Sequence, residues 1–168
     1  MATINHPFTP ADAIAPSTNF AGYRVRQGTN FPIAGLDFDP TTNESVVFCL
    51  VATGYGSGNV TVRVDWEADT ASSGDVIWGV QLACITPNTD TQDVETKAFA
   101  TANTATDTHL GTVVQRLHTI DITVTNLDSL AVGDWVTVKV YRDAASASDT
   151  MTTSDATILF INISYSDT

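Results

Sequence analysis

Residues 59–68, NVTVRVDWEA, alternate between two kinds of side chain. The apolar side chains, at every second position, are Val60, Val62, Val64 and Trp66. Polar side chains fill the positions between them. Because successive side chains of a β-strand point to opposite faces, a period of two is the signature of a strand. The stretch therefore predicts a strand with one face in a core and the other in water.

Runs of the same kind lie on both sides of this stretch. They are SVVFCLVAT (45–53), DVIWGVQLACIT (75–86), LHTIDITVT (117–125), DWVTVKVYRD (134–143) and ATILFINISYS (156–166). A further strand is predicted around Lys97–Ala102, and the glycine-rich residues 54–59 are predicted to form a hairpin loop. No segment has a sustained period of 3.6, and no repeat of 20–50 residues is present.

Seven or eight short strands separated by turn residues predict an all-β fold, an antiparallel β-sandwich. An eight-stranded jelly roll is the expected topology. An immunoglobulin-like sandwich is the alternative, although the spacing of Cys49, Cys84 and the tryptophans does not match its disulfide core.

The first 36 residues differ from the rest of the chain. They contain four prolines and carry a net charge of +1, whereas residues 37–168 carry −13, which gives the −12 of the whole chain. Prolines disfavour regular helix, and the apolar residues of this segment are too few for a core of their own. We therefore expect residues 1–36 to form an extended N-terminal arm and residues 37–168 to form the sandwich domain.

The acidic composition excludes some partners. Nineteen acidic residues oppose seven basic ones, so nucleic acid and anionic membrane surfaces are not expected to bind. The sequence has no run of about 18 apolar residues, which is the length needed to cross a membrane. Its first residues also lack the basic and apolar regions of a secretory signal.

No catalytic or metal site is evident. Histidines 6, 109 and 118 form no ligand motif. His6 lies in the N-terminal segment, and His109 and His118 are interpreted as surface or strand-end residues. Cys49 is expected to face outward and Cys84 inward, which predicts two free thiols. The pairs Asp37/Asp39 and Asp65/Glu67 each share a strand face, which leaves glycoside hydrolysis and calcium binding as remote alternatives to a solvated acidic face. We predict no enzyme activity and no cofactor.

Three stretches carry a resemblance to a known family. They are DFDPTTNESVVF (37–48), GNVTVRVDWEADTASSGDVIWGVQ (58–81) and LAVGDWVTVKVYRDAASASDT (130–150). Over residues 37–165 the chain resembles small virion structural proteins of tailed bacteriophages, with Val132 as a departure where the family pattern has a smaller residue. The resemblance implies a β-sandwich or jelly-roll module on a phage particle.

Two functions follow from this resemblance. The first is a non-enzymatic capsid decoration (cement) protein, a homotrimer on the virion surface whose N-terminal arm bridges subunits of the major capsid protein. The second is a receptor- or carbohydrate-binding module of a phage fibre. For the first, the expected contact residues are Ile4, Phe8, Ile14, Phe20, Tyr23, Arg24, Arg26, Phe31, Trp135 and Tyr141.

Trp135 and Tyr141 share the polar face of their predicted strand. Either a loop or the N-terminal segment packs over them, or they belong to a surface between subunits, where aromatic side chains are enriched.

Overall fold

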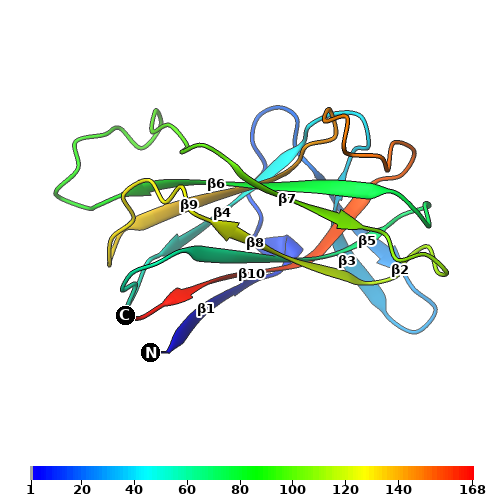
Figure 1. Cartoon of the computed structure of the whole chain (residues 1–168), viewed down its shortest axis with the longest axis horizontal. Helices are drawn as coiled ribbons and strands as arrows, with labels where there is room; N and C mark the ends of the chain where they lie inside the picture. Colours follow the sequence, from blue (N-terminus) through cyan, green and yellow to red (C-terminus); the bar gives the residue numbers. More distant parts are fainter. Residues whose placement is uncertain (1) are drawn as a thin grey trace.

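Two antiparallel sheets face each other in the computed structural model, which describes residues 2–168 (Figure 1). A 3₁₀ turn, η1, spans Pro10–Asp12. The strands are β1 (Thr3–Phe8), β2 (Gly22–Gln27), β3 (Pro32–Phe38), β4 (Ser45–Val51), β5 (Val60–Ala68), β6 (Asp75–Ile85), β7 (Asn103–Thr108), β8 (His118–Val124), β9 (Trp135–Arg142) and β10 (Ala156–Ser166).

Strands β3 to β10 pair as a long hairpin that has been rolled up. β3 pairs with β10, β4 with β9, β5 with β8 and β6 with β7, all antiparallel. This nesting places β3-β10-β5-β8 in one sheet and β4-β9-β6-β7 in the other. The arrangement is an eight-stranded jelly roll, so the predicted fold class is confirmed.

The core lies between the two sheets and follows the sequence alternation. The apolar residues of β5 are buried, and Val62, Val64 and Trp66 have no exposed surface. The ring of Trp78 on β6 meets Phe38 edge-on at 5.2 Å and Trp66 at 6.1 Å. Such edge-to-face aromatic pairs contribute stability beyond the area they bury.

The N-terminal segment is part of the sandwich, unlike the separate arm expected for residues 1–36. Strand β1 pairs with the end of β10, from Thr3 opposite Ser166 to Phe8 opposite Ile161, and β2 forms a hairpin with β3. The sandwich domain was expected to begin at residue 37, but its strand β3 already begins at Pro32. Residue 1 lies outside the described residues.

Proline is compatible with these strands because of where it stands. Pro7 lies in β1, which pairs with β10 alone, and Pro32 is the first residue of β3. Edge strands and strand starts tolerate proline, since the missing N–H group is not needed in the ladder. The prolines of the N-terminal segment therefore do not mark a boundary between an arm and the sheet.

Two local predictions are corrected. Residues 54–59 connect β4 to β5, which lie in different sheets, so the segment is a crossover between sheets and not a hairpin. The strand expected around Lys97–Ala102 lies at Asn103–Thr108 instead. Alternating Asn, Thr, Ala and Asp residues there give a weak apolar signal, because β7 is an edge strand with one solvated face.

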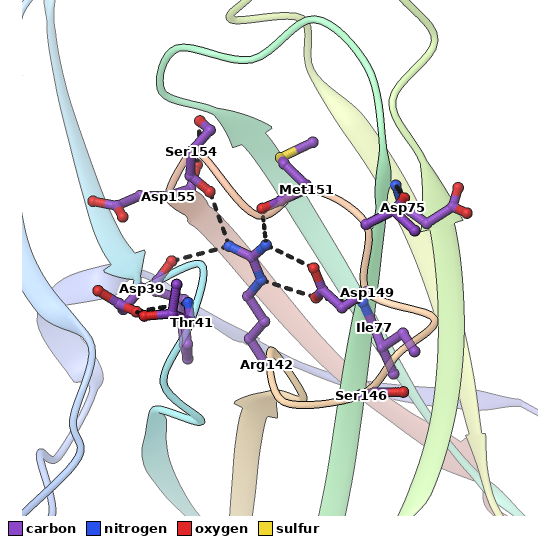
Figure 2. A network of polar contacts seen from close by, with 12 residues as sticks. Asp39, Thr41, Asp75, Ile77, Arg142, Ser146, Asp149, Met151, Ser154 and Asp155 are labelled. Carbon is purple, nitrogen blue, oxygen red and sulfur yellow. Dashed lines mark hydrogen bonds and ion pairs between the residues drawn. The ribbon is translucent and has the colours of Figure 1, made fainter.

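A buried ion pair anchors the loop between β9 and β10 (Figure 2). Arg142 donates from Nη2 and Nε to the two carboxylate oxygens of Asp149 at 2.8 and 2.9 Å. Its remaining donors reach the backbone oxygens of Phe38, Ser154 and Met151. Neither charged side chain is exposed, and all the guanidinium donors are used, so the pair is structural.

Within the described residues no helix is long and apolar enough to cross a membrane.

Candidate functional site

A groove of about 400 Å³ crosses the outer face of the four-stranded sheet. Its floor consists of side chains on β4, β6 and β9 that point away from the core. Residues 16–19 and Phe99, from the long β6–β7 connection, also line it. The floor residues are Ser45, Val47, Gln81, Lys139 and Tyr141. This size is within the range of small-molecule sites.

The side chain of Tyr141, on β9, lies over Gly79 of the neighbouring strand β6. The two residues face each other in the β6–β9 ladder, and a Cβ atom at position 79 would overlap the Tyr141 ring. The glycine thus gives the ring room to lie against the floor of the groove. Burial, followed by the nearby Asp143 carboxylate, raises the pKa of the Tyr141 phenol, so the hydroxyl is protonated at neutral pH.

Lys139 places its ammonium group between two aromatic rings. Its Nζ atom is 5.8 Å from the ring centre of Phe99 and 5.7 Å from that of Tyr141. Both distances are within the range of cation–π attraction. Within residues 2–168 Lys139 contacts no carboxylate, whereas ion pairs are formed by Arg24, Arg26, Arg63, Lys97 and Arg142.

Gln81 attaches the β6–β7 connection to the groove. Its Nε2 donates to the backbone oxygen of Ala100 at 2.9 Å, and the Ala100 N–H donates to the Leu82 oxygen at 2.8 Å. These two bonds hold the backbone beside Phe99 against β6. The side-chain oxygen of Gln81 accepts no hydrogen bond from residues 2–168, so it is available to a ligand.

Asn43 and Glu44 form a polar rim. The Asn43 amide donates to Asp143 at 2.8 Å and accepts from the Ala145 N–H at the same distance. Glu44 accepts the Asp39 N–H with Oε2 at 2.8 Å. Burial raises the pKa of Glu44, and nearby carboxylates add to the shift.

A second concavity, of about 440 Å³, adjoins the groove through Asn19 and Glu44. Asp37 and Asp39, one of the predicted carboxylate pairs, both line it. Asp37 pairs with Arg24 at 2.7 Å, and Asp39 accepts the Thr41 and Thr42 N–H groups of a turn. In residues 2–168 no group of three or more potential ligands is arranged to hold a metal ion.

The ten predicted contact residues do not form one surface. Ile4 and Phe8 turn inward and pack against the core, with the Phe8 ring 5.2 Å from that of Phe48. Trp135 and Tyr141 are half-buried, and of these two only Tyr141 lines the groove. The predicted residues with largely exposed side chains are Ile14, Phe20, Tyr23 and Phe31.

Two of the predicted contacts are used within the chain. Arg24 and Arg26 were expected to be contact residues of a capsid decoration protein, but Arg24 pairs with Asp37 and Asp69, and Arg26 pairs with Glu67. The hairpin of β2 and β3 brings these charges together on one face of the six-stranded sheet. The Arg26 side chain thereby reaches Glu67, which is 3% exposed, and burial raises the pKa of the Glu67 carboxyl group.

The two later histidines stand at strand ends, as one of the two predicted alternatives has it: His109 follows β7, and His118 begins β8. Both are buried, so they are not surface residues. The rings of His109 and His118 are 4.5 Å apart, and that of His118 stacks on Trp66 at 4.7 Å. His109 accepts the Gly111 N–H with Nδ1, so its Nε2 carries the proton that it donates to the Val114 oxygen.

The groove residues other than Tyr141 were missed because they stand apart in the sequence. Phe99 is a single apolar residue in a long polar connection, and Gln81 interrupts an apolar run. The available signal was the outward face of β9, where Lys139 and Tyr141 alternate with buried valines. That signal identifies the face but not the neighbouring strands.

No family model matches the chain, and no curated protein matches it. Solved structures do. An isomalto-dextranase of Arthrobacter globiformis T6, complexed with panose, is 15% identical with a TM-score of 0.55, and the match covers 99% of this chain but 23% of that one. The chain therefore spans about a quarter of the length of that protein.

Two weaker matches come from other kinds of protein. A family 11 carbohydrate-binding module from Clostridium thermocellum, in complex with a β-1,3-1,4-mixed-linked tetrasaccharide, is 8% identical with a TM-score of 0.47, covering 96% of this chain and 87% of that one. A protein of infectious bursal disease virus, Gx strain, is 7% identical with a TM-score of 0.40, covering 98% and 33%. At these identities the likeness concerns the fold alone.

The expected virion location, the major capsid protein as partner, the homotrimer and the lack of enzyme activity stay predictions. The expected bridging of capsid subunits by an extended N-terminal arm does not fit the structure, however. Because residues 3–8 and 22–38 contribute strands to the sandwich, they are not free to reach across a capsid as an arm.

Proposed function

We propose that this protein is a carbohydrate-binding β-sandwich module and that the groove on the four-stranded sheet holds the ligand. The observation that carries the proposal is the convergence of Phe99, Lys139 and Tyr141 on one open groove of about 400 Å³. This combination supplies apolar ring surface and a charged hydrogen-bond donor at the same place.

A sugar ring presents both C–H faces and hydroxyl groups, so its site needs two kinds of contact. Aromatic rings contact the C–H faces without losing hydrogen bonds, and a phenol adds a polar end. Donors and acceptors must meet the hydroxyl groups, because a polar group buried without a partner is costly. The groove provides both kinds of contact on a floor made by three neighbouring strands.

The polar groups of the groove are partly unused. Within residues 2–168 no hydrogen bond is made by the Tyr141 hydroxyl, the Lys139 ammonium or the Gln81 side-chain oxygen. By contrast, the Asn43 amide is fixed by two hydrogen bonds and serves the rim. The three free groups are therefore the expected contacts to ligand hydroxyls.

The scaffold supports a site of fixed shape. The floor side chains come from β4, β6 and β9, whose ladders run for seven or eight residue pairs. Sites on such strands are held more rigidly than sites on loops. The lining residues from residues 16–19 and the β6–β7 connection then supply selectivity around a rigid floor.

The test is glycan-array binding of the full chain, followed by calorimetry on the best neutral and acidic glycans. Tyr141→Ala is expected to weaken binding at least about tenfold, which corresponds to about 1.4 kcal/mol. Trp135→Ala is the matched control, because Trp135 lies on the same face of β9 but outside the groove. Absence of glycan binding by the wild-type chain, or equal losses in both variants, would contradict the proposal.

A further inference from the structure

Strand β2 is a sheet edge that the rest of the described chain leaves uncovered. The edge strand β4 is bridged by Ile14 and Phe20. The edges of β7 and β8 meet near one end, where the Asn103 side chain of β7 bonds to Thr125 just after β8. The free edge of β1 contains Pro7, which has no N–H group to offer. An unpaired edge is a template on which another strand can add.

The register of the β2–β3 hairpin shows which backbone groups are free. The Gly28 N–H donates to the Phe31 oxygen, which makes this pair hydrogen-bonded. Hydrogen-bonded and non-hydrogen-bonded pairs alternate along an antiparallel ladder. The groups of Arg26 and Arg24 therefore face β3, whereas those of Tyr23, Val25 and Gln27 point away from the sheet.

The backbone N–H and C=O groups that point away from the sheet belong to Tyr23, Val25 and Gln27, and they are arranged symmetrically about Val25. In an antiparallel pair of two β2 strands centred on this residue, Val25 faces Val25 of the second copy and Tyr23 faces Gln27 of the second copy. All three outward residues then find hydrogen-bonded partners at once. A two-fold axis through the centre makes the interface isologous, as in most dimers.

Side chains on this edge favour the same partner. Tyr23 is 56% exposed and Val25 is 48% exposed, although both lie on the sheet face that Leu36 turns to the core. An apolar hollow of about 340 Å³ adjoins Tyr23 and is lined in part by Phe20 and Val46. Two-fold pairing would join the two apolar surfaces into one and remove them from water.

The charge distribution permits self-association here. The chain carries −12 overall, but residues 1–36 carry two arginines and one aspartate. Arg24 and Arg26, which would face each other across the axis, pair with three carboxylates of their own chain, so their positive charges are compensated. The β2 edge is thus a part of an acidic molecule where a second copy meets little repulsion.

We propose that β2 pairs antiparallel with β2 of a second copy about a two-fold axis at Val25, which joins two six-stranded sheets into one. The proposal does not depend on the ligand groove, because β2 belongs to the six-stranded sheet and the floor of the groove belongs to the four-stranded sheet. The trimer implied by the family resemblance is a different assembly, and the two are distinguished by mass.

The first experiment measures the mass of the full chain in solution by light scattering, from low to high micromolar concentration. A species of twice the monomer mass is expected. Amide exchange followed by NMR then tests the register. The amides of Tyr23, Val25 and Gln27 should gain protection as the dimer forms, whereas those of Arg24 and Arg26 should be protected at every concentration. A monomer at all concentrations, or a trimer, would overturn the proposal.

Variants separate pairing from folding. Val25→Lys places two ammonium groups face to face across the axis and is expected to give a monomer with an unchanged circular dichroism spectrum. Val25→Thr is the matched control, since it keeps β-branching and the N–H group, and it is expected to remain a dimer. A dimer of unchanged affinity in Val25→Lys would also overturn the proposal.

Discussion

The guanidinium group of Arg142 faces the carboxylate of Asp149 with two hydrogen bonds, and neither side chain is exposed to solvent (Figure 2). The pair closes the segment that leaves β9 and returns to β10. Asp149 also accepts the Ile77 N–H at 3.2 Å, which ties this segment to β6. The buried pair therefore connects three strands of the jelly roll, namely β9, β10 and β6.

Removing one member of this pair is expected to destabilise the protein strongly. Asp149→Ala leaves a buried guanidinium without its counter-charge, and the expected loss is about 3–5 kcal/mol in the free energy of unfolding. Urea denaturation followed by tryptophan fluorescence measures it. Asp65→Ala is the control, because Asp65 pairs with the exposed Arg63 and such pairs contribute about 0–1 kcal/mol. Equal effects of the two variants would contradict a structural role for the buried pair.

His118 is expected to make stability depend on pH below neutrality. Burial, and then the nearby His109, lowers the pKa of His118 from 6.5. Its Nε2 is buried without a partner among residues 2–168, so the protonated form gains nothing there. Since the unfolded chain then binds the proton more readily, stability is lost as pH falls below about 6.5.

The variant His118→Phe isolates this effect. A phenyl ring keeps the stack on Trp66 but cannot be protonated. The midpoint of thermal unfolding should therefore fall less between pH 8 and pH 5 in the variant than in the wild type. Parallel pH curves for the two proteins would show that His118 does not titrate in this range.

Much of the fold could be predicted because the buried residues alternate. Val60, Val62, Val64 and Trp66 are buried as their period requires, and Cys49 and Cys84 face outward and inward as expected. Alternation reports burial on one face of a strand. It does not indicate which strand lies alongside, so it predicts a hairpin at residues 54–59, where the structure has a crossover between the sheets.

The N-terminal strands and the groove depend on long-range pairing. Thr3 lies opposite Ser166, and Gln81, Phe99 and Tyr141 meet in one groove from separate parts of the chain. Short edge strands such as β1 and β2 carry few buried residues, and their prolines and arginines resemble those of a loop. Their place in the sheet is fixed by partners distant in sequence, which local patterns do not contain.

The two cysteines are expected to differ in reactivity. Burial raises the pKa of the Cys84 thiol to about 12, and its sulfur donates to the Leu127 oxygen at 3.4 Å. Cys49 is half-buried on the outer face of β4. Because the thiolate is the reactive form, Ellman's reagent should modify Cys49 alone in the native protein and both thiols after unfolding. Cys49→Ser should abolish the native reaction, and Cys84→Ser should leave it unchanged; the reverse pattern would contradict the assignment.

Gly79 is expected to determine the position of Tyr141. A methyl group in Gly79→Ala would overlap the Tyr141 ring, so the ring must move away from the groove floor or the strands must separate. Overpacking of this kind costs about 1–3 kcal/mol, and the displaced ring should weaken binding of any glycan that the wild-type chain binds. Gly22→Ala is the matched control, since a Cβ atom at this strand position meets no atom within 4 Å. Thermal unfolding and calorimetry of the two variants give both quantities. A Gly79→Ala protein with wild-type stability and wild-type affinity would show that the ring is free to adjust, and that its contact with Gly79 does not shape the groove.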